Sequence, residues 1–178
     1  RGAEALQANV NALRRGIEAA ANFPQRTPLA AGQDAGAGAG AGRWLISGNE
    51  AAGFGAVRGG IRFVAAYPIT PATEMLEWMA PALTQVGGSL LQAEDELASV
   101  NMIIGASFGG VPSLTATAGP GLALMTEGIG LAITAEVPIV VVDVMRGGPS
   151  TGIPAKSEQS DLSYAVSGLH GDAPRIVV

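Results

Sequence analysis

Three consecutive carboxylates, Glu94, Asp95 and Glu96, stand between an apolar run and a segment of helical character. Residues 89–92 read as a buried strand that ends just before them, and a helix is expected over 96–108. Asp95 and Glu96 fit the cap and first turn of that helix, because a helix N-terminus stabilises negative charge. Glu94 precedes the cap, at the carboxyl end of a strand, where ligands bind in open α/β sheets.

Two interpretations of Glu94 are open from the residues alone. Small and apolar neighbours would keep its carboxyl group out of water, and such a group can share a proton with a ligand nitrogen. The alternative is an ordinary cap or an ion pair on the surface.

Two further segments place polar side chains after expected strands. In YPITP, residues 67–71, Thr70 is expected as an N-cap and Pro71 as the first helical residue, which a structural role explains. The functional alternative is that the Thr70 hydroxyl and the N–H groups of the helix end bind an anion. Arg146 opens the segment RGGPSTG, where its guanidinium could hold a carboxylate or lie in an ordinary exposed loop.

The remaining motifs exclude several kinds of site. The turn TATAGPG, residues 115–121, has neither Gly-Lys-Ser/Thr nor a basic residue, so its glycines are expected to admit a flat ligand or a partner chain. Residues 48–60 contain no GxGxxG, the fingerprint of dinucleotide binding. The chain has no cysteine, and its one histidine, His170, lies in a polar context. We therefore expect neither a metal site nor a Ser-His-Asp triad.

The elements that would position these residues alternate along the chain. Besides those already named, we expect strands at 44–47, 62–67, 112–117 and 139–144, and helices at 49–57 with Asn49 as cap, 72–83 and 122–134. This alternation predicts an α/β fold in which a parallel sheet is covered by helices on both faces. The irregular segment 146–161 has the length of a binding loop or lid.

Composition limits the class of protein. The chain is 48% hydrophobic but only 4% aromatic, so its core must be aliphatic. A net charge of −5, with Lys156 as the one lysine and no basic cluster, argues against nucleic acid as the main partner. No apolar run is long enough to span a bilayer, and the lack of cysteine fits a cytoplasmic protein.

The chain is expected to have two parts. Aliphatic residues recur at helical spacing near its start and predict an amphipathic helix that packs on an upstream domain or a partner: Leu6, Val10, Leu13 and Ile17. Residues 35–42 alternate Ala and Gly and read as a flexible tether. We expect residues 1–43 to be this helix and tether, and 44–178 to be the folded domain. The chain does not start with Met and ends on an apparent strand, 176–178, so we expect a segment of a longer polypeptide.

Five segments, in this order, resemble one family: GNEAAGFGA (48–56), YPITPATE (67–74), QAEDELASVNMIIGAS (92–107), TATAGPGLALMTEGIG (115–130) and RGGPSTGIPAKSEQSDL (146–162). They are similar to the α subunit of 2-oxoacid:ferredoxin oxidoreductases, in particular the 2-oxoglutarate type with a fused upstream γ domain. The likeness covers nearly everything from Arg43 onward. It implies that the preceding helix and tether are the tail of the γ domain and its linker.

The resemblance implies a thiamine diphosphate-dependent enzyme, with residues 44–178 as its pyrimidine-binding domain. By motif, Glu94 would hydrogen-bond the aminopyrimidine ring, where a carboxyl group favours the tautomer that can deprotonate the thiazolium ring. Pro68 would line the cofactor, and Thr117 would form part of the pocket wall.

The same resemblance implies where the substrate binds. Thr70 and Arg146 would hold the carboxylate of the 2-oxoacid, and Lys156 would meet the second carboxylate of a dicarboxylic substrate. The implied reaction is the oxidative decarboxylation of 2-oxoglutarate to succinyl-CoA, in which coenzyme A takes the acyl group and ferredoxin takes the electrons.

Some of the binding sites that the resemblance implies have no matching residues in this chain. It has no GDG-type motif for Mg²⁺ and diphosphate and no cysteines for a [4Fe–4S] cluster, so both are expected on a β subunit, in a heterotetramer whose active site is split between subunits. Pyruvate or branched-chain 2-oxoacids are alternative substrates, and a non-catalytic scaffold is an alternative function. Glu94, Thr70 and Arg146 at one sheet edge argue against the scaffold.

Overall fold

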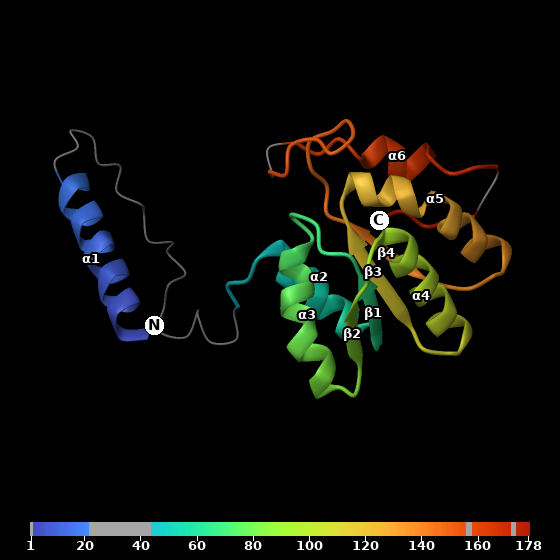
Figure 1. Ribbon diagram of the computed structural model, residues 1–178, viewed down its shortest axis with the longest axis horizontal. Coiled ribbons are helices and arrows are strands. Elements are labelled where there is room, and N and C mark those ends of the chain that lie inside the picture. The colour runs from blue at the N-terminus through green and yellow to red at the C-terminus, as the bar shows by residue number, and fades with distance from the viewer. Residues whose placement is uncertain (1, 22–43, 156–157, 172–173) are drawn as a thin grey trace, which may run out of the picture. The chain divides into compact units, whose positions relative to one another are not determined.

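The computed structural model describes residues 2–21, 44–155, 158–171 and 174–178 (Figure 1). The chain divides into two compact units, Arg1–Trp44 and Leu45–Val178, close to the boundary expected at Arg43. The expected Ala-Gly tether lies outside the described residues. None of the described helices has the length and apolar character needed to cross a membrane.

The first unit contains helix α1 (Gly2–Ala20), which confirms the amphipathic helix expected from aliphatic spacing. None of its residues is buried, and Leu6, Leu13 and Ile17 are each more than 60% exposed. That these aliphatic residues pack on an upstream domain or a partner stays a prediction.

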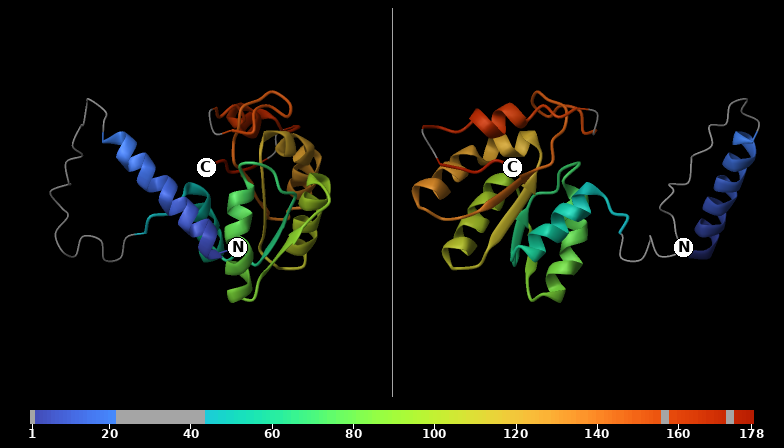
Figure 2. Two further views of the ribbon diagram at one scale, coloured as in Figure 1. Left: turned by 60° about the vertical axis from the view of Figure 1, so that its left-hand side comes forward. Right: turned by 180° about the vertical axis from the view of Figure 1, so that it is seen from behind.

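The second unit is built on a four-stranded sheet of order β2-β1-β3-β4, in which all neighbours are parallel. The strands are β1 (Phe63–Ala66), β2 (Ser89–Gln92), β3 (Ser113–Thr117) and β4 (Val140–Asp143). The helices are α2 (Gly48–Arg58), α3 (Thr73–Gln85), α4 (Glu96–Phe108), α5 (Gly119–Thr134) and α6 (Leu162–Ser167). Helices α2 and α3 cover one face of the sheet and α4 and α5 the other (Figures 1 and 2), which confirms the expected α/β fold.

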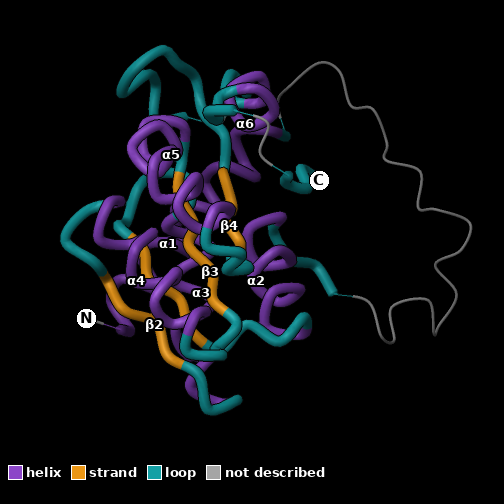
Figure 3. The backbone as a smooth tube through the Cα atoms, turned by 90° about the vertical axis from the view of Figure 1, so that its right-hand side faces the viewer, coloured by secondary structure: helices purple, strands orange, loops and turns teal. Residues whose placement is uncertain are grey.

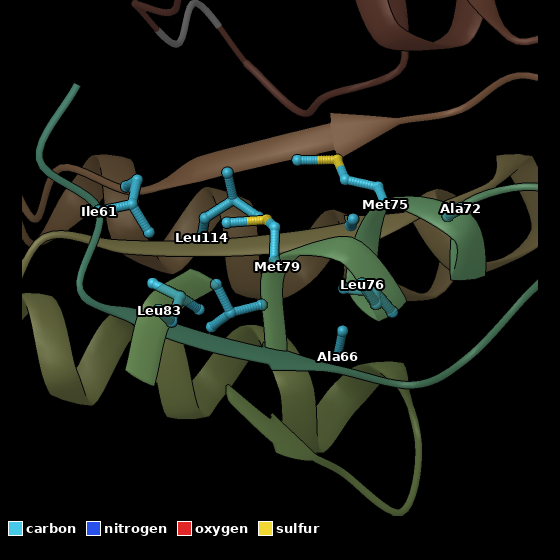
Figure 4. Close-up of a cluster of buried hydrophobic side chains, with 10 residues drawn as sticks. Ile61, Ala66, Ala72, Met75, Leu76, Met79, Leu83 and Leu114 are labelled. Carbon is cyan, nitrogen blue, oxygen red and sulfur yellow. The ribbon is translucent and has the colours of Figure 1, made fainter. Parts of the chain in front are cut away.

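An aliphatic core lies between the sheet and α3 (Figure 4). The strand residues Val64 and Leu114 meet Met75, Met79 and Leu83, and each of the five is at most 1% exposed. Full burial of such a side chain contributes about 1.5–3 kcal/mol. The edge strands β2 and β4 are less buried than β1 and β3, because each has a strand neighbour on only one side.

On the opposite face, α4 lies against β1 and β3, and α5 lies beside α4 (Figure 3). The two helices come together at Gly128, where an added Cβ would be 2.6 Å from Cγ1 of Val100. Glycine is therefore required at this crossing.

Two predicted elements are wrong, and two predicted caps are misplaced. Residues 44–47 form no strand and pair with neither edge strand, β2 or β4, and Trp44 and Leu45 are exposed. Ser47 caps α2 in place of Asn49, accepting the Glu50 N–H at 3.2 Å while its own N–H donates to Glu50 Oε2 at 2.7 Å. Residues 176–178 have no regular secondary structure.

Thr70 is not the N-cap of α3. The Ile69 carbonyl accepts the N–H of Thr73 at 3.1 Å, so a turn precedes the helix and Ala72 takes the cap position. The bounds of β2 and α4 are those expected, whereas α5 begins at Gly119, three residues before the expected start at 122.

Strand β4 ends on Asp143, whose two carboxylate oxygens are buried without a hydrogen-bond partner in the described part of the chain. Burial, and secondarily the charge of Asp161, raises the pKa of Asp143 from 3.8 to about 7. The folded protein therefore holds a proton on this group that the unfolded chain releases near pH 4.

We expect Gly128→Ala to lower the free energy of unfolding by about 1–3 kcal/mol, because the new methyl group overpacks the contact with Val100. The control is Gly130→Ala in the same helix, where nothing lies within 4 Å of the added Cβ. Improved helix propensity should make this control neutral or more stable by up to about 1 kcal/mol. Urea unfolding measures both, and equal stabilities would contradict the tight crossing.

We expect the contribution of Asp143 to the stability of the wild-type protein to fall as the pH rises from about 4 to about 7, the interval between the unfolded and folded pKa values of this group. Asp143→Asn removes this contribution. It should raise the free energy of unfolding at pH 8 by about 1–2 kcal/mol, less than the full pKa shift would give, because solvent screens a partly buried charge. Urea unfolding at pH 5 and pH 8 tests this, with the exposed Glu127→Gln as control. A variant that gains no stability at pH 8 relative to pH 5 would contradict it.

Candidate functional site

The sheet parts at its carboxyl edge between the two central strands. The β1–β3 ladder covers only Phe63↔Ser113 and Val64↔Leu114, although both strands continue. Strand β1 instead pairs with β2 as far as Gln92, and β3 pairs with β4 as far as Asp143. The chain also reverses direction across the sheet here, since β1 leads to β2 on one side and β3 leads to β4 on the other. Such a switch point is where open α/β sheets bind ligands.

Glu94 lies in the turn after β2, at this edge. The preceding Ala93 is buried and its N–H donates to the Ala66 carbonyl at 3.0 Å, so the turn is tied to the end of β1. The side chain of Glu94 is exposed, and no described residue hydrogen-bonds its carboxylate. The expectation that Glu94 lies out of water is therefore wrong for the described part of the chain, where Glu94 follows an edge strand of the sheet and is exposed. The carboxylate can meet a group outside the chain.

The buried carboxylate of the acidic run is Glu96, at 7% exposed. Asp95 is the N-cap of α4, as predicted, and accepts the Ala98 N–H at 2.7 Å. The buried face of α4 is formed by Glu96, Ser99, Val100 and Ile103. That spacing is the signal that could have identified Glu96 from the sequence, since positions three, four and seven residues apart share one helix face.

Arg146 joins the end of β4 to the loop after β1. Its side chain is 6% exposed, with Nη1 donating to the Thr70 carbonyl at 2.9 Å and Nη2 to the Thr151 carbonyl at 2.6 Å. Nε is buried and has no partner among the described residues. The structure thus brings Arg146 and Thr70 together as expected, but two guanidinium nitrogens already bind carbonyls of the same chain. A substrate carboxylate could use only the N–H groups that remain.

The other predicted residues differ in accessibility. The Thr70 side chain is exposed and Pro68 is half-buried. Thr117 is fully buried, and its hydroxyl lies 3.4 Å from the Ala118 carbonyl. The geometry gives no support to Thr117 as a pocket wall, which stays a prediction. Lys156 lies outside the described residues.

The loop from Arg146 to Asp161 is fastened at both ends. The Arg146 N–H donates to Asp161 Oδ2 at 3.2 Å, and the Ser160 hydroxyl donates to the Arg146 carbonyl at 2.9 Å. Within the loop, the Ile153 N–H donates to the Gly147 carbonyl at 2.9 Å. These bonds fix the backbone from which the Arg146 side chain projects.

A cleft of about 360 Å³ lies beside the end of β4, but none of Glu94, Thr70 and Arg146 lines it. Its lining residues are Ser47, Gly48, Asn49, Pro71, Glu74, Asp143, Val144, Met145 and Gln159. The amide of Asn49 donates to the Pro71 carbonyl and to Glu74 Oε2, so these polar groups already have partners. The described residues contain no cluster of three or more acidic or histidine side chains suited to a metal ion.

Comparison with known proteins places this fold in a family. The profile described as "Pyruvate flavodoxin/ferredoxin oxidoreductase, thiamine diP-bdg" matches residues 54–178. The 2-oxoglutarate synthase subunit KorA of Archaeoglobus fulgidus is 51% identical over 134 residues, covering 75% of this chain and 39% of that protein. The KorA subunit of Methanocaldococcus jannaschii is 52% identical over 128 residues, covering 72% of this chain and 35% of that protein.

A solved structure gives the same result. The 2-oxoglutarate:ferredoxin oxidoreductase from Magnetococcus marinus, with 2-oxoglutarate, coenzyme A and succinyl-CoA bound, matches with a TM-score of 0.73 at 45% identity. The match covers 97% of this chain and 30% of that chain. The chain therefore spans only 30–39% of the length of these three proteins. Together with the parted parallel sheet, the profile match shows that the chain belongs to the pyruvate flavodoxin/ferredoxin oxidoreductase family, of which it carries the thiamine diphosphate-binding domain.

Proposed function

We propose that this chain is the pyrimidine-binding part of the α subunit of a 2-oxoglutarate:ferredoxin oxidoreductase. The complete enzyme converts 2-oxoglutarate, coenzyme A and oxidised ferredoxin to succinyl-CoA, CO₂ and reduced ferredoxin. The observation that carries the proposal is the exposed carboxylate of Glu94, without a partner among the described residues, beside the parted ends of β1 and β3. Identity of about one half to KorA subunits favours 2-oxoglutarate as substrate.

The residues at the sheet edge fit one half of thiamine diphosphate. When bound, the cofactor supplies the carbon nucleophile and electron sink that decarboxylation of a 2-oxoacid requires. The Glu94 carboxylate is a free acceptor that can hold a proton against a nitrogen of the aminopyrimidine ring. Pro68, half-buried where β1 ends, can line the ring.

The other half of the site belongs to a second chain in this proposal. The described residues contain no group of three or more acidic or histidine side chains that could hold a metal ion, and the whole sequence lacks cysteine. We assign Mg²⁺, the diphosphate contacts and a [4Fe–4S] cluster to a β subunit, in a heterotetramer of α and β chains. Closure of that subunit over β2 would exclude water from Glu94, which strengthens its interaction with the ring.

Arg146 supports a site for the substrate carboxylate. A buried N–H without a partner costs about 1–3 kcal/mol, and a carboxylate at Nε would remove that cost. The Thr70 hydroxyl is exposed close by, since its carbonyl binds the same guanidinium. For the second carboxylate of 2-oxoglutarate we propose Lys156, from its charge alone.

The proposal is tested by assembling the full α subunit with its β partner. Coenzyme A-dependent reduction of ferredoxin is followed with 2-oxoglutarate, pyruvate and branched-chain 2-oxoacids, and 2-oxoglutarate should give the highest kcat/KM. A preference for pyruvate or a branched-chain acid would change the substrate assignment. An assembled complex without activity on any 2-oxoacid would favour the non-catalytic scaffold.

We expect Glu94→Gln to lower kcat at least about 100-fold, because an amide cannot exchange the proton that a carboxylate exchanges. Assembly with the β subunit, measured by size-exclusion chromatography, should not change. The control is Glu77→Gln, an exposed glutamate of α3 away from the sheet edge, which should retain the wild-type rate. Normal turnover by Glu94→Gln would show that the proton-holding role is wrong.

We expect Arg146→Lys to raise the KM for the 2-oxoacid by about 10-fold or more, because an ammonium group cannot bind two carbonyls in the fork geometry and also present Nε. The control is Arg62→Lys at the amino edge of the sheet. Nη1 of Arg62 also binds two carbonyls, those of Val57 at 3.1 Å and Ile61 at 2.8 Å. An equal rise in KM for both variants would show a general loss of order instead of a substrate contact.

A further inference from the structure

Helix α5 begins at the carboxyl edge without a cap of its own. The N-cap residue, Ala118, has no side chain that can bind the free N–H groups, and its carbonyl accepts the N–H of Gly121 at 2.8 Å. The first turn contains Gly119 and Gly121, which were expected to admit a flat ligand or a partner chain. In the structure, side chains from elsewhere in the same chain fill the space beside both glycines.

Asp161 occupies the space at Gly119. A Cβ there would lie 2.5 Å from Cγ of Asp161 and would clash with its Oδ1. Asp161 stands at the N-cap position of α6 but does not cap that helix; its carboxylate accepts the N–H of Arg146 instead. Asp161 thus joins the start of α5 to the backbone of Arg146.

Glu96 occupies the space at Gly121. A Cβ there would lie 2.8 Å from both Cγ and Oε1 of Glu96 and would also clash with the Thr117 hydroxyl. Glu96 is the first residue of α4, two residues after Glu94, and is 7% exposed. Glu96 thus joins the start of α5 to the turn that carries Glu94.

We propose that the N-terminal end of α5 holds two segments in place: the loop that begins at Arg146 and the turn that carries Glu94. Asp161 is the positioning residue for Arg146, and Glu96 is the positioning residue for Glu94. The inference rests on the proposed function, which gives Arg146 and Glu94 their roles. A helix N-terminus carries about half a unit of positive charge, so two carboxylates from distant segments are stabilised at an end that lacks its own cap. The two glycines are required because any side chain would displace these carboxylates.

The test uses the assembled enzyme and two variants of each contact. Asp161→Asn removes the charge, and Gly119→Ala displaces the carboxylate. Both should raise the KM for the 2-oxoacid about 10-fold while kcat stays within about twofold. Glu96→Gln and Gly121→Ala should lower kcat about 10-fold while the KM for the 2-oxoacid stays within about twofold. Glu127→Gln and Gly130→Ala in α5 are the controls for loss of charge and for added Cβ.

A double-variant cycle tests whether the effect of Gly119→Ala passes through Asp161. Combined with Asp161→Ala, which leaves nothing to displace, Gly119→Ala should add no further rise in KM. Additive effects of the two substitutions would overturn the contact as the cause.

Amide hydrogen exchange in the cofactor-free assembled enzyme gives a readout independent of turnover. Asp161→Asn should accelerate exchange of the Arg146 amide, whose acceptor is changed, but not of the residues in the Glu94 turn. Glu96→Gln should accelerate exchange in that turn and leave Arg146 unchanged. Acceleration of both loops by either variant would indicate general loosening and overturn the proposal.

Failure of this inference can be told apart from failure of the proposed function. A fully active wild-type enzyme whose Asp161 and Glu96 variants lose only thermal stability, with unchanged KM and kcat, would overturn this inference alone. A wild-type complex inactive on every 2-oxoacid would overturn the proposed function, and this inference with it.

Discussion

The buried guanidinium of Arg146, held between the carbonyls of Thr70 and Thr151, fixes the carboxyl edge of this sheet. Removal of a cation from water is costly, and carbonyl dipoles offset that cost without cancelling the charge as a carboxylate would. The pKa of the neighbouring strand-end residue, Asp143, is raised to about 7, so below that pH its carboxyl group is mostly neutral. Arg146 therefore supplies positive charge beside a mostly neutral Asp143, while the carboxylates of Asp161 and Glu94 also lie at this edge.

The three consecutive acidic residues at the start of α4, from Glu94 to Glu96, have three different structural roles. Asp95 caps the helix, Glu96 is buried against α5, and Glu94 is exposed at the end of an edge strand. Each task follows from position: the cap needs an extended backbone, the first helical residue shares the buried face with Ser99 and Val100, and the residue before the cap lies beyond the helix. Three consecutive carboxylates thus lie in three different environments.

Much of the fold could be predicted from local pattern, because apolar periodicity determines where β2 and α4 begin and end. The failures have long-range causes. Residues 44–47 have a strand-like composition but pair with neither free edge of the sheet, and the cap of α3 shifted because a turn at Ile69 precedes it. Likewise, no local pattern could show that Asp161 lies against Gly119, a contact across more than forty residues.

The exposure of Glu94, the half-buried position of Asp161 and the burial of Glu96 have a common physical consequence. Among the described residues, the Arg146 loop and the Glu94 turn are held by contacts within this chain, whereas no described residue hydrogen-bonds the exposed Glu94 carboxylate. In the two-subunit enzyme that we propose, the backbone that carries Arg146 and Glu94 is therefore ordered before the second subunit binds. Association then loses little conformational entropy at these loops, and binding free energy can be used to exclude water from the site. In the split active site that we propose, the carboxylates of Asp161 and Glu96 at the start of α5 would hold this half in place before the second subunit binds.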